Sequence, residues 1–240
     1  MILPHPLPYC GAAPDPAALL TRFNFDPRLL LALLIFAGFH LFVMRRRPGR
    51  GLLLGGWLVA AFAFISPLCA LSVSLFSARV TQHMLLVLVA APLLAARWPV
   101  RPPPLWGATA CFFLSLWFWH MPVPYDATFR SSGLYWSMHL SLFGSAILLW
   151  AALLAHARKD VPAALAAGTI SSMQMGLLGA LLSLANRPLF TPHQLTTAAW
   201  GITPLADQQL GGAIMWVPGI FLFLWLALWA AGGALSGARA

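Results

Sequence analysis

Three histidines of the chain each stand next to a methionine, as His83-Met84, His120-Met121 and Met138-His139. With 7 His and 8 Met in 240 residues, random order would produce only about half of one such pair. Imidazole and thioether are ligands of copper, and thioether favours Cu(I). The pairs therefore predict a copper site. The alternative is that methionine fills apolar space and histidine lies among lipid headgroups.

The composition places these residues in a membrane protein. The chain is 60% hydrophobic and only 8% charged, whereas about a quarter of the residues are charged in a soluble domain. A transmembrane helix needs about 20 mainly apolar residues, and the runs here are continuous rather than alternating as a barrel requires. We expect one integral membrane domain over residues 1–240, an all-α polytopic bundle of about seven helices. The expected helices cover residues 27–44, 51–75 (bent at Pro67), 80–96, 104–121, 134–156, 162–185 and 210–235.

The basic residues predict the orientation of this bundle. The net charge is +9, but the basic residues form short clusters between apolar runs rather than a stripe, so we exclude nucleic acid as a partner. One set of links contains nine basic residues and the other set five, and the richer side faces the cytoplasm. The N-terminus is therefore expected outside and the C-terminus in the cytoplasm. The nine are Arg45, Arg46, Arg47, Arg50, Arg97, Arg101, Arg158, Lys159 and Arg239; the five are Arg22, Arg28, Arg79, Arg130 and Arg187.

The same topology brings the histidines to one depth. His83, His120 and His139 fall near the outer ends of the third, fourth and fifth expected helices, and helices joined by short links usually pack as neighbours. We therefore expect the three rings to converge on one metal ion. The surrounding ligands or supports are expected to be Met84, Met121, Met138, Met215 and Asp207. Asp207 stands just before the last expected helix, where it would cap that helix or hold a ligand histidine by its other nitrogen.

Other chemistry has little support in the sequence. Cys10, Cys69 and Cys111 show no CxxC spacing and predict neither a disulfide framework nor a zinc site. No apolar run precedes the first basic residue, Arg22, so we expect no cleavable signal peptide. There is no nucleophile–base arrangement, phosphate loop or pair of carboxylates, and the protein is not expected to be an enzyme.

Several motifs resemble one family, the CtaG-type (caa3-type) cytochrome c oxidase assembly factors. The similarity runs from Phe25-Asp26-Pro27 to the last helix and is most specific in residues 200–216, from Trp200 to Trp216. It is also carried by Ile65-Ser66-Pro67-Leu68, Gln82-His83-Met84, Ala91-Pro92-Leu93-Leu94, Tyr125-Asp126, Met138-His139-Leu140 and Asn186-Arg187-Pro188-Leu189.

The resemblance implies a multi-pass protein of the bacterial inner membrane that assembles haem–copper oxidase by copper delivery. Its implied partners are oxidase subunits, a copper donor protein and the lipid bilayer. Family members often have a further His-Met pair where this chain has Arg79 and Val80, and a positive charge there would weaken cation binding. Three alternatives remain: a haem-binding protein with two of the histidines as axial ligands, a copper transporter, and a metal-free scaffold for oxidase subunits.

Overall fold

The computed structural model describes residues 7–46, 49–96, 101–157 and 159–237, and within these ranges the chain is all-helical. Three described helical segments are long and apolar enough to cross a membrane: Phe76–Ala95, Ser132–His156 (α8) and Val161–Ser183 (α9). A bent pair of helices, α2 (Arg50–Ile65) and α3 (Leu68–Ser74), would be a fourth span. The expected all-α membrane fold is confirmed, whereas the count of seven spans stays a prediction.

The remaining elements follow the expected runs, with differences at their ends. Helices α1 (Pro27–Val43) and α6 (Leu105–Trp119) are shorter apolar helices, and a short helix α7 (Pro122–Ala127) follows α6. The last helix, α10 (Pro204–Gly237), begins six residues earlier than predicted, because proline is well suited to the first position of a helix. Asp207 therefore lies in the first turn of α10 rather than before it.

Two spans depart from regular α-helix. Helices α2 and α3 meet at 48°, as predicted from Pro67, which holds the preceding Ser66 in an extended conformation. The span Phe76–Ala95 is built of α4 (Phe76–Met84), a π-helical segment η2 (Leu85–Ala90) and α5 (Ala91–Ala95). A π-helical segment leaves backbone groups available to other partners, and the Trp150 indole N–H donates to the Val87 carbonyl over 2.9 Å.

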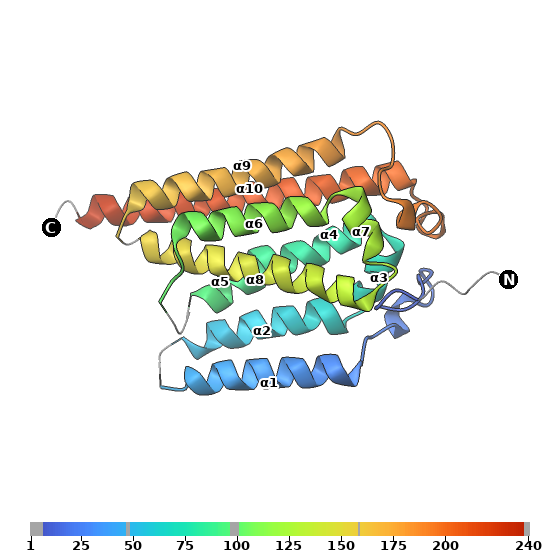
Figure 1. Cartoon of the computed structure of the whole chain (residues 1–240), viewed down its shortest axis with the longest axis horizontal. Coiled ribbons are helices and arrows are strands. Elements are labelled where there is room, and N and C mark those ends of the chain that lie inside the picture. Colours follow the sequence, from blue (N-terminus) through green and yellow to red (C-terminus); the bar gives the residue numbers. More distant parts are fainter. Residues whose placement is uncertain (1–6, 47–48, 97–100, 158, 238–240) are drawn as a thin grey trace.

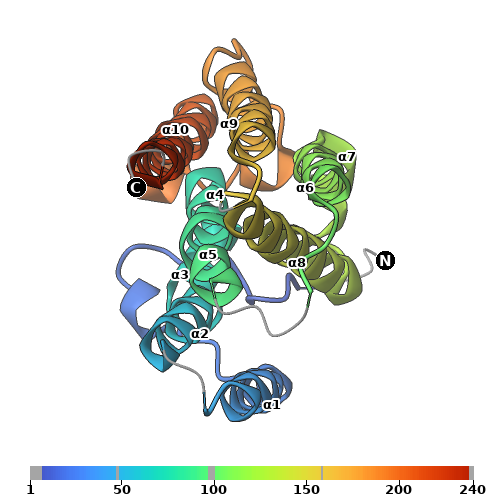
Figure 2. The same ribbon diagram turned by 90° about the vertical axis from the view of Figure 1, so that its left-hand side faces the viewer.

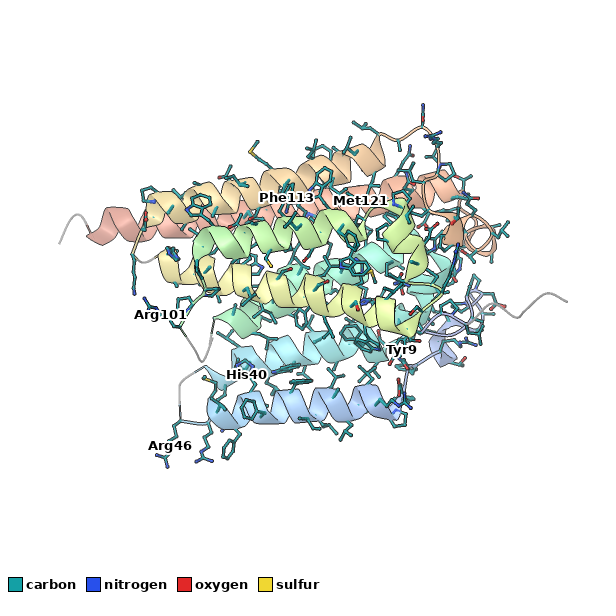
Figure 3. All side chains as sticks on the ribbon, in the orientation of Figure 1. Tyr9, His40, Arg46, Arg101, Phe113 and Met121 are labelled. Carbon is teal, nitrogen blue, oxygen red and sulfur yellow. A yellow bond between two sulfur atoms is a disulfide. The ribbon has the colours of Figure 1, made fainter. Side chains whose placement is uncertain are left out.

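The two ends of the bundle differ in what they contain (Figure 1). The C-terminal ends of α1, α5 and α8 and the N-terminal ends of α2, α6 and α9 share one end of the bundle. The opposite end holds the N-terminal segment, α3, α7 and the 3₁₀ turns η3 (Thr191–His193) and η4 (Ala198–Trp200). Arg46 and Arg101 lie at the first end and Tyr9 at the second (Figure 3). This separation matches the predicted grouping of links. Arg47, Arg97, Arg158 and Arg239 lie outside the described residues.

Seen along the bundle, α4, α5 and α8 occupy the centre (Figure 2). Helices α9 and α10 lie on one side of them, α2 on another, and α1 is outermost. Two of these central helices, α4 and α8, hold His83 and His139, which are both buried.

The N-terminal segment folds back over the second end and is fixed there by a disulfide between Cys10 and Cys69. The sequence reading that expected no disulfide is therefore wrong. The two cysteines are 59 residues apart, and only the return of the N-terminal segment onto α3 brings them together. Spacing alone gives no sign of such a pair.

Candidate metal centre

The three predicted histidines meet in the interior. His83 comes from α4, His120 from the C-terminal cap of α6, and His139 from α8. The ring centroid of His83 lies 5.5 Å from that of His120 and 5.1 Å from that of His139, both in edge-to-face contact. All three side chains are buried. The predicted convergence of the side chains is thus present in the fold.

The hydrogen bonds of two rings leave one nitrogen of each free. The Nδ1 atom of His120 lies 2.7 Å from the Leu116 carbonyl, and that of His139 lies 3.0 Å from the Tyr135 carbonyl. A carbonyl can only accept, so each Nδ1 carries the proton and each Nε2 keeps a lone pair. These two Nε2 atoms and both ring nitrogens of His83 are buried without a hydrogen-bond partner. Since an unpartnered buried polar atom costs about 1–3 kcal/mol, the cluster has the character of an incomplete ligand set.

The present arrangement is not yet a coordination sphere. Within the described ranges, no group of three or more His, Cys, Asp or Glu side chains is spaced to hold a metal ion. The rings pack edge to face, whereas nitrogen ligands of one ion all lie at about 2 Å from it. Rotation of the rings toward one point would be needed for His83, His120 and His139 to share an ion.

Asp207 positions this cluster in a way that the sequence did not predict. Its carboxylate accepts hydrogen bonds from the backbone N–H of Phe76 at 2.6 Å and of Ser77 at 3.1 Å, and from the Ser77 hydroxyl. These are the first residues of α4, so Asp207 caps α4 from the neighbouring α10. It neither caps its own helix nor bonds a histidine. Asp207 therefore influences the position of His83 indirectly, by fixing the start of α4.

The four predicted methionines divide into two groups. Met84, Met138 and Met215 are buried in the main hydrophobic core. Met121 follows the end of α6 and its side chain is 50% exposed. Met84 and Met138 adjoin His83 and His139 in the sequence, and Met121 is placed away from the core.

Most of the chain matches a known protein family. The family model of the cytochrome c oxidase caa3 assembly factors matches residues 38–104 and 101–235. The chain belongs to this family. Comparisons with curated proteins and with solved structures gave no significant match. The matched residues of this assembly factor include all three clustered histidines and Asp207, and they exclude the N-terminal segment with Cys10.

In this assembly factor Arg79 is a buried cation within α4. The predicted topology places it in a link before the third expected helix, and the family resemblance marks it as a departure from the family pattern. Its side chain is 1% exposed, its Nε–H donates to the Ser72 carbonyl over 3.4 Å, and its Nη1 has no partner among the described residues. The guanidinium faces the rings of Phe129 at 4.6 Å and Tyr135 at 5.3 Å. These contacts stabilise the cation on aromatic faces, one helical turn outward from His83.

A second cluster, at the end of the bundle that holds α3 and α7, contains a fourth buried histidine. His193 in η3 lies 2.7 Å from the Tyr125 hydroxyl through Nε2, and the neighbouring Asp126 accepts a hydrogen bond from Thr191. Burial, together with the charge of Arg79, lowers the pKa of His193 to about 3. The hydrogen bond with Tyr125 links η3 to α7.

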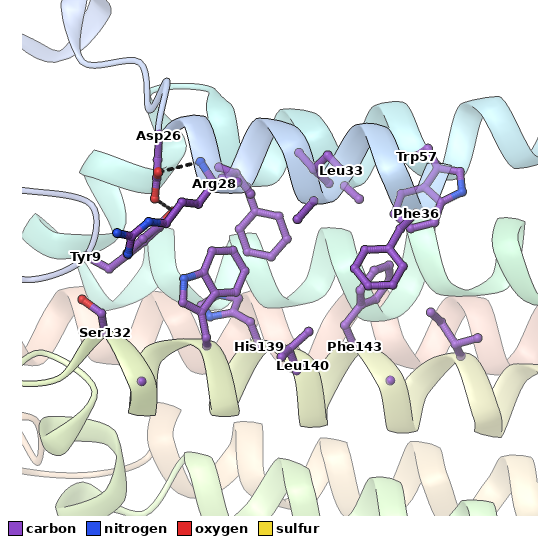
Figure 4. Close-up of a pocket in the computed structure, with 18 residues that line it drawn as sticks. Tyr9, Asp26, Arg28, Leu33, Phe36, Trp57, Ser132, His139, Leu140 and Phe143 are labelled. Atoms are coloured by element: carbon purple, nitrogen blue, oxygen red, sulfur yellow. Dashed lines mark hydrogen bonds between the residues drawn. The ribbon is translucent and has the colours of Figure 1, made fainter. Parts of the chain in front are cut away.

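A groove between α1, α2 and α8 reaches the same region from the side of the bundle (Figure 4). Its volume is about 790 Å³, and its inner wall is apolar and includes one edge of His139. Polar groups gather at its outer mouth, where the Tyr9 hydroxyl donates to Asp26 over 2.7 Å and lowers the pKa of that carboxyl. The groove therefore approaches the histidine cluster at His139, which is itself buried.

Proposed function

We propose that this assembly factor binds copper as cargo on His83, His120 and His139 and passes it to haem–copper oxidase subunits. In this proposal it acts as a multi-pass, non-enzymatic protein of the bacterial inner membrane. The copper would arrive from a donor protein on the outer side. The family match supports the role in oxidase assembly, and the chemistry of the cluster supports the choice of metal.

One observation supports the copper step above the others. Buried imidazole nitrogens from three helices lie side by side without hydrogen-bond partners. Neutral imidazole is a good ligand for copper, and the adjacent buried methionines offer thioether sulfur suited to Cu(I). All these ligands are uncharged, and Arg79 adds a positive charge nearby. Such a site should hold a cation less tightly than a thiolate site would, as a site that releases its cargo requires.

The same geometry argues against the two other metal-related functions. Edge-to-face contacts at 5.1 and 5.5 Å leave no space for a porphyrin plane between the rings of His83 and its neighbours. A transporter would need ligands continuing toward the other end of the bundle. Of the residues that could extend such a path, Cys111 and Met173 lie on exposed faces, whereas Met175 is buried in the core. The path toward the other end is therefore sparse.

The test is copper analysis of purified protein together with function in cells. Replacing His83, His120 and His139 by alanine should abolish Cu(I) binding to oxidised protein. The same triple variant should fail to restore copper oxidase activity to a deletion strain at limiting copper. His156→Ala is the matched control, because His156 lies on α8 and bonds the Ala152 carbonyl through Nδ1 just as His139 bonds Tyr135.

Each readout can contradict the proposal separately. Full copper binding by the folded triple variant would place the metal elsewhere. Loss of copper with full oxidase assembly would leave only the function of a metal-free scaffold.

A further inference from the structure

We propose that Cys10 and Cys69, once reduced, form a second Cu(I) site one layer outward from the histidine cluster. This inference deepens the proposed function, since it assumes that copper is the cargo. The cysteine pair would bind the copper first, and the histidine cluster would receive it from the pair. The redox state of the pair would then decide whether the protein can take up copper.

The position of the pair relative to the histidines is the first step. The Tyr135 hydroxyl lies 3.5 Å from Cys10 Sγ and 3.8 Å from Cys69 Sγ. The ring of the same tyrosine lies 4.3 Å from the His139 ring, measured between centroids. One aromatic side chain therefore separates the sulfur atoms from the first imidazole. Tyr135 and His139 are one turn of α8 apart, a rise of about 6 Å.

The surroundings suit thiolates as well as a disulfide. The Tyr135 hydroxyl and the Asn24 side-chain amide, which is 3.6 Å from Cys69 Sγ, can both donate hydrogen bonds to sulfur. Donors of this kind stabilise a charged thiolate. Cys69 is fully buried and Cys10 is half-buried, so a reductant can approach the pair from the Cys10 side.

The positive charge of Arg79 would balance the negative charge of a Cu(I)–dithiolate complex. It borders Tyr135 from the α4 side, with its guanidinium 5.3 Å from the ring. The chain has five acidic residues, and each carboxylate bonds another group. Asp15 accepts from Ala18, Asp26 from Tyr9, and Asp126 from Thr191. Asp160 accepts from Ala163, and Asp207 accepts from Phe76 and Ser77. Within the part of the chain that the structure describes, Arg79 bonds the Ser72 carbonyl and no carboxylate, and an unpaired buried charge is costly.

The chemical steps balance in charge and electrons. A dithiol reductant gives two electrons and two protons to the Cys10–Cys69 disulfide and becomes a disulfide itself. The two thiols then bind Cu(I) as thiolates and release two protons. Cu(I) with two thiolates has a net charge of −1, and Arg79 supplies +1. Thiolate is the preferred ligand of Cu(I), so the loaded pair would be a neutral site.

The experiment measures Cu(I) per chain in full-length protein under anaerobic conditions, before and after reduction by a non-thiol phosphine. A Cys111→Ser background removes the exposed thiol. Reduction should add one Cu(I) per chain, with a sulfur–copper charge-transfer absorption in the ultraviolet. The addition should be absent in Cys10→Ser and in reduced protein alkylated before copper is supplied. Arg79→Gln should weaken binding at the pair by on the order of tenfold, and Arg79→Lys should restore most of it.

The histidine and cysteine variants test this inference and the proposed function separately. The triple histidine variant should lose the copper bound by oxidised protein and keep the copper gained on reduction. If reduction adds no copper to folded wild-type protein, or if the phosphine cannot reduce the pair, the Cys10–Cys69 bond is a structural staple and the inference is wrong. An unchanged gain in Cys10→Ser would contradict it as well.

Discussion

Asp207 shows how a single residue can hold a site that it does not touch. Its carboxylate satisfies the first free N–H groups of α4, the helix that ends at Met84 next to His83. Because the carboxylate is fully buried, its removal would leave Phe76 and Ser77 without partners in an apolar setting. Hydrogen bonds to charged groups are worth more than neutral ones.

We expect Asp207→Ala to lower the free energy of unfolding by about 2–4 kcal/mol and to reduce copper binding in proportion to the displacement of His83. The measurement is thermal unfolding in detergent combined with metal analysis. Asp160→Ala is the control, since Asp160 caps α9 from an exposed position and should cost only about 1 kcal/mol. Equal small effects of the two substitutions would show that the cap does not position α4.

At the scale of residues, the sequence predicted the histidine cluster because type, neighbour and depth all coincided at His83, His120 and His139. It could not predict the partner of Asp207, because the cap reaches across 131 residues from α10 to α4. The disulfide was missed for the same reason. Contacts between distant segments leave no local pattern.

At the scale of elements, a close backbone approach joins α9 and α10. A Cβ atom added to Gly212 would stand 2.5 Å from the Gly179 carbonyl oxygen and 2.7 Å from the Ser183 amide nitrogen. These are backbone atoms that cannot move aside on their own. Small residues allow such close packing of membrane helices, and this packing fixes the start of α10, where Asp207 lies.

Gly212→Ala should therefore push α9 and α10 apart and lower stability by about 1–3 kcal/mol. Gly144→Ala in α8 is the matched control, because an added Cβ there meets nothing within 4 Å, and alanine is the better helix former. Thermal unfolding in detergent compares the two variants. A neutral Gly212→Ala would mean that the contact between the helices is looser than the structure has it.

The apolar runs predicted the elements well, and their internal breaks less well. The bend at Pro67 followed from proline geometry, and the start of α10 was misplaced because residues 207–209, Asp-Gln-Gln, are polar although helical. The π-helical segment Leu85–Ala90 has no sequence signature in a uniformly apolar run. It depends on tertiary partners such as Trp150, which hydrogen-bonds to Val87.

At the scale of the whole molecule, charge and disulfide argue for the same orientation. The described links that contain Arg45, Arg46 and Arg101 share one end of the bundle, and the Cys10–Cys69 disulfide lies at the other (Figure 1, Figure 3). Basic links favour the cytoplasm, and disulfides persist in oxidising compartments. Two independent properties thus favour the predicted orientation, in which the histidine cluster would lie near the outer face and within reach of a copper donor.

Reporter fusions test this orientation directly. A reporter active only in the cytoplasm should be active when fused in the link at residues 45–50 and inactive in the segment at residues 186–209. A reporter active only outside should give the opposite pattern. The physical reason is that moving the arginine-rich link across the bilayer is costly, whereas the segment at residues 186–209 carries few charges.

A membrane-impermeant thiol reagent gives an independent check, because it should label Cys10 in intact spheroplasts only after reduction. The reverse reporter pattern, or labelling of Cys10 only in broken cells, would place the histidines on the cytoplasmic side and exclude uptake of copper from an outer donor.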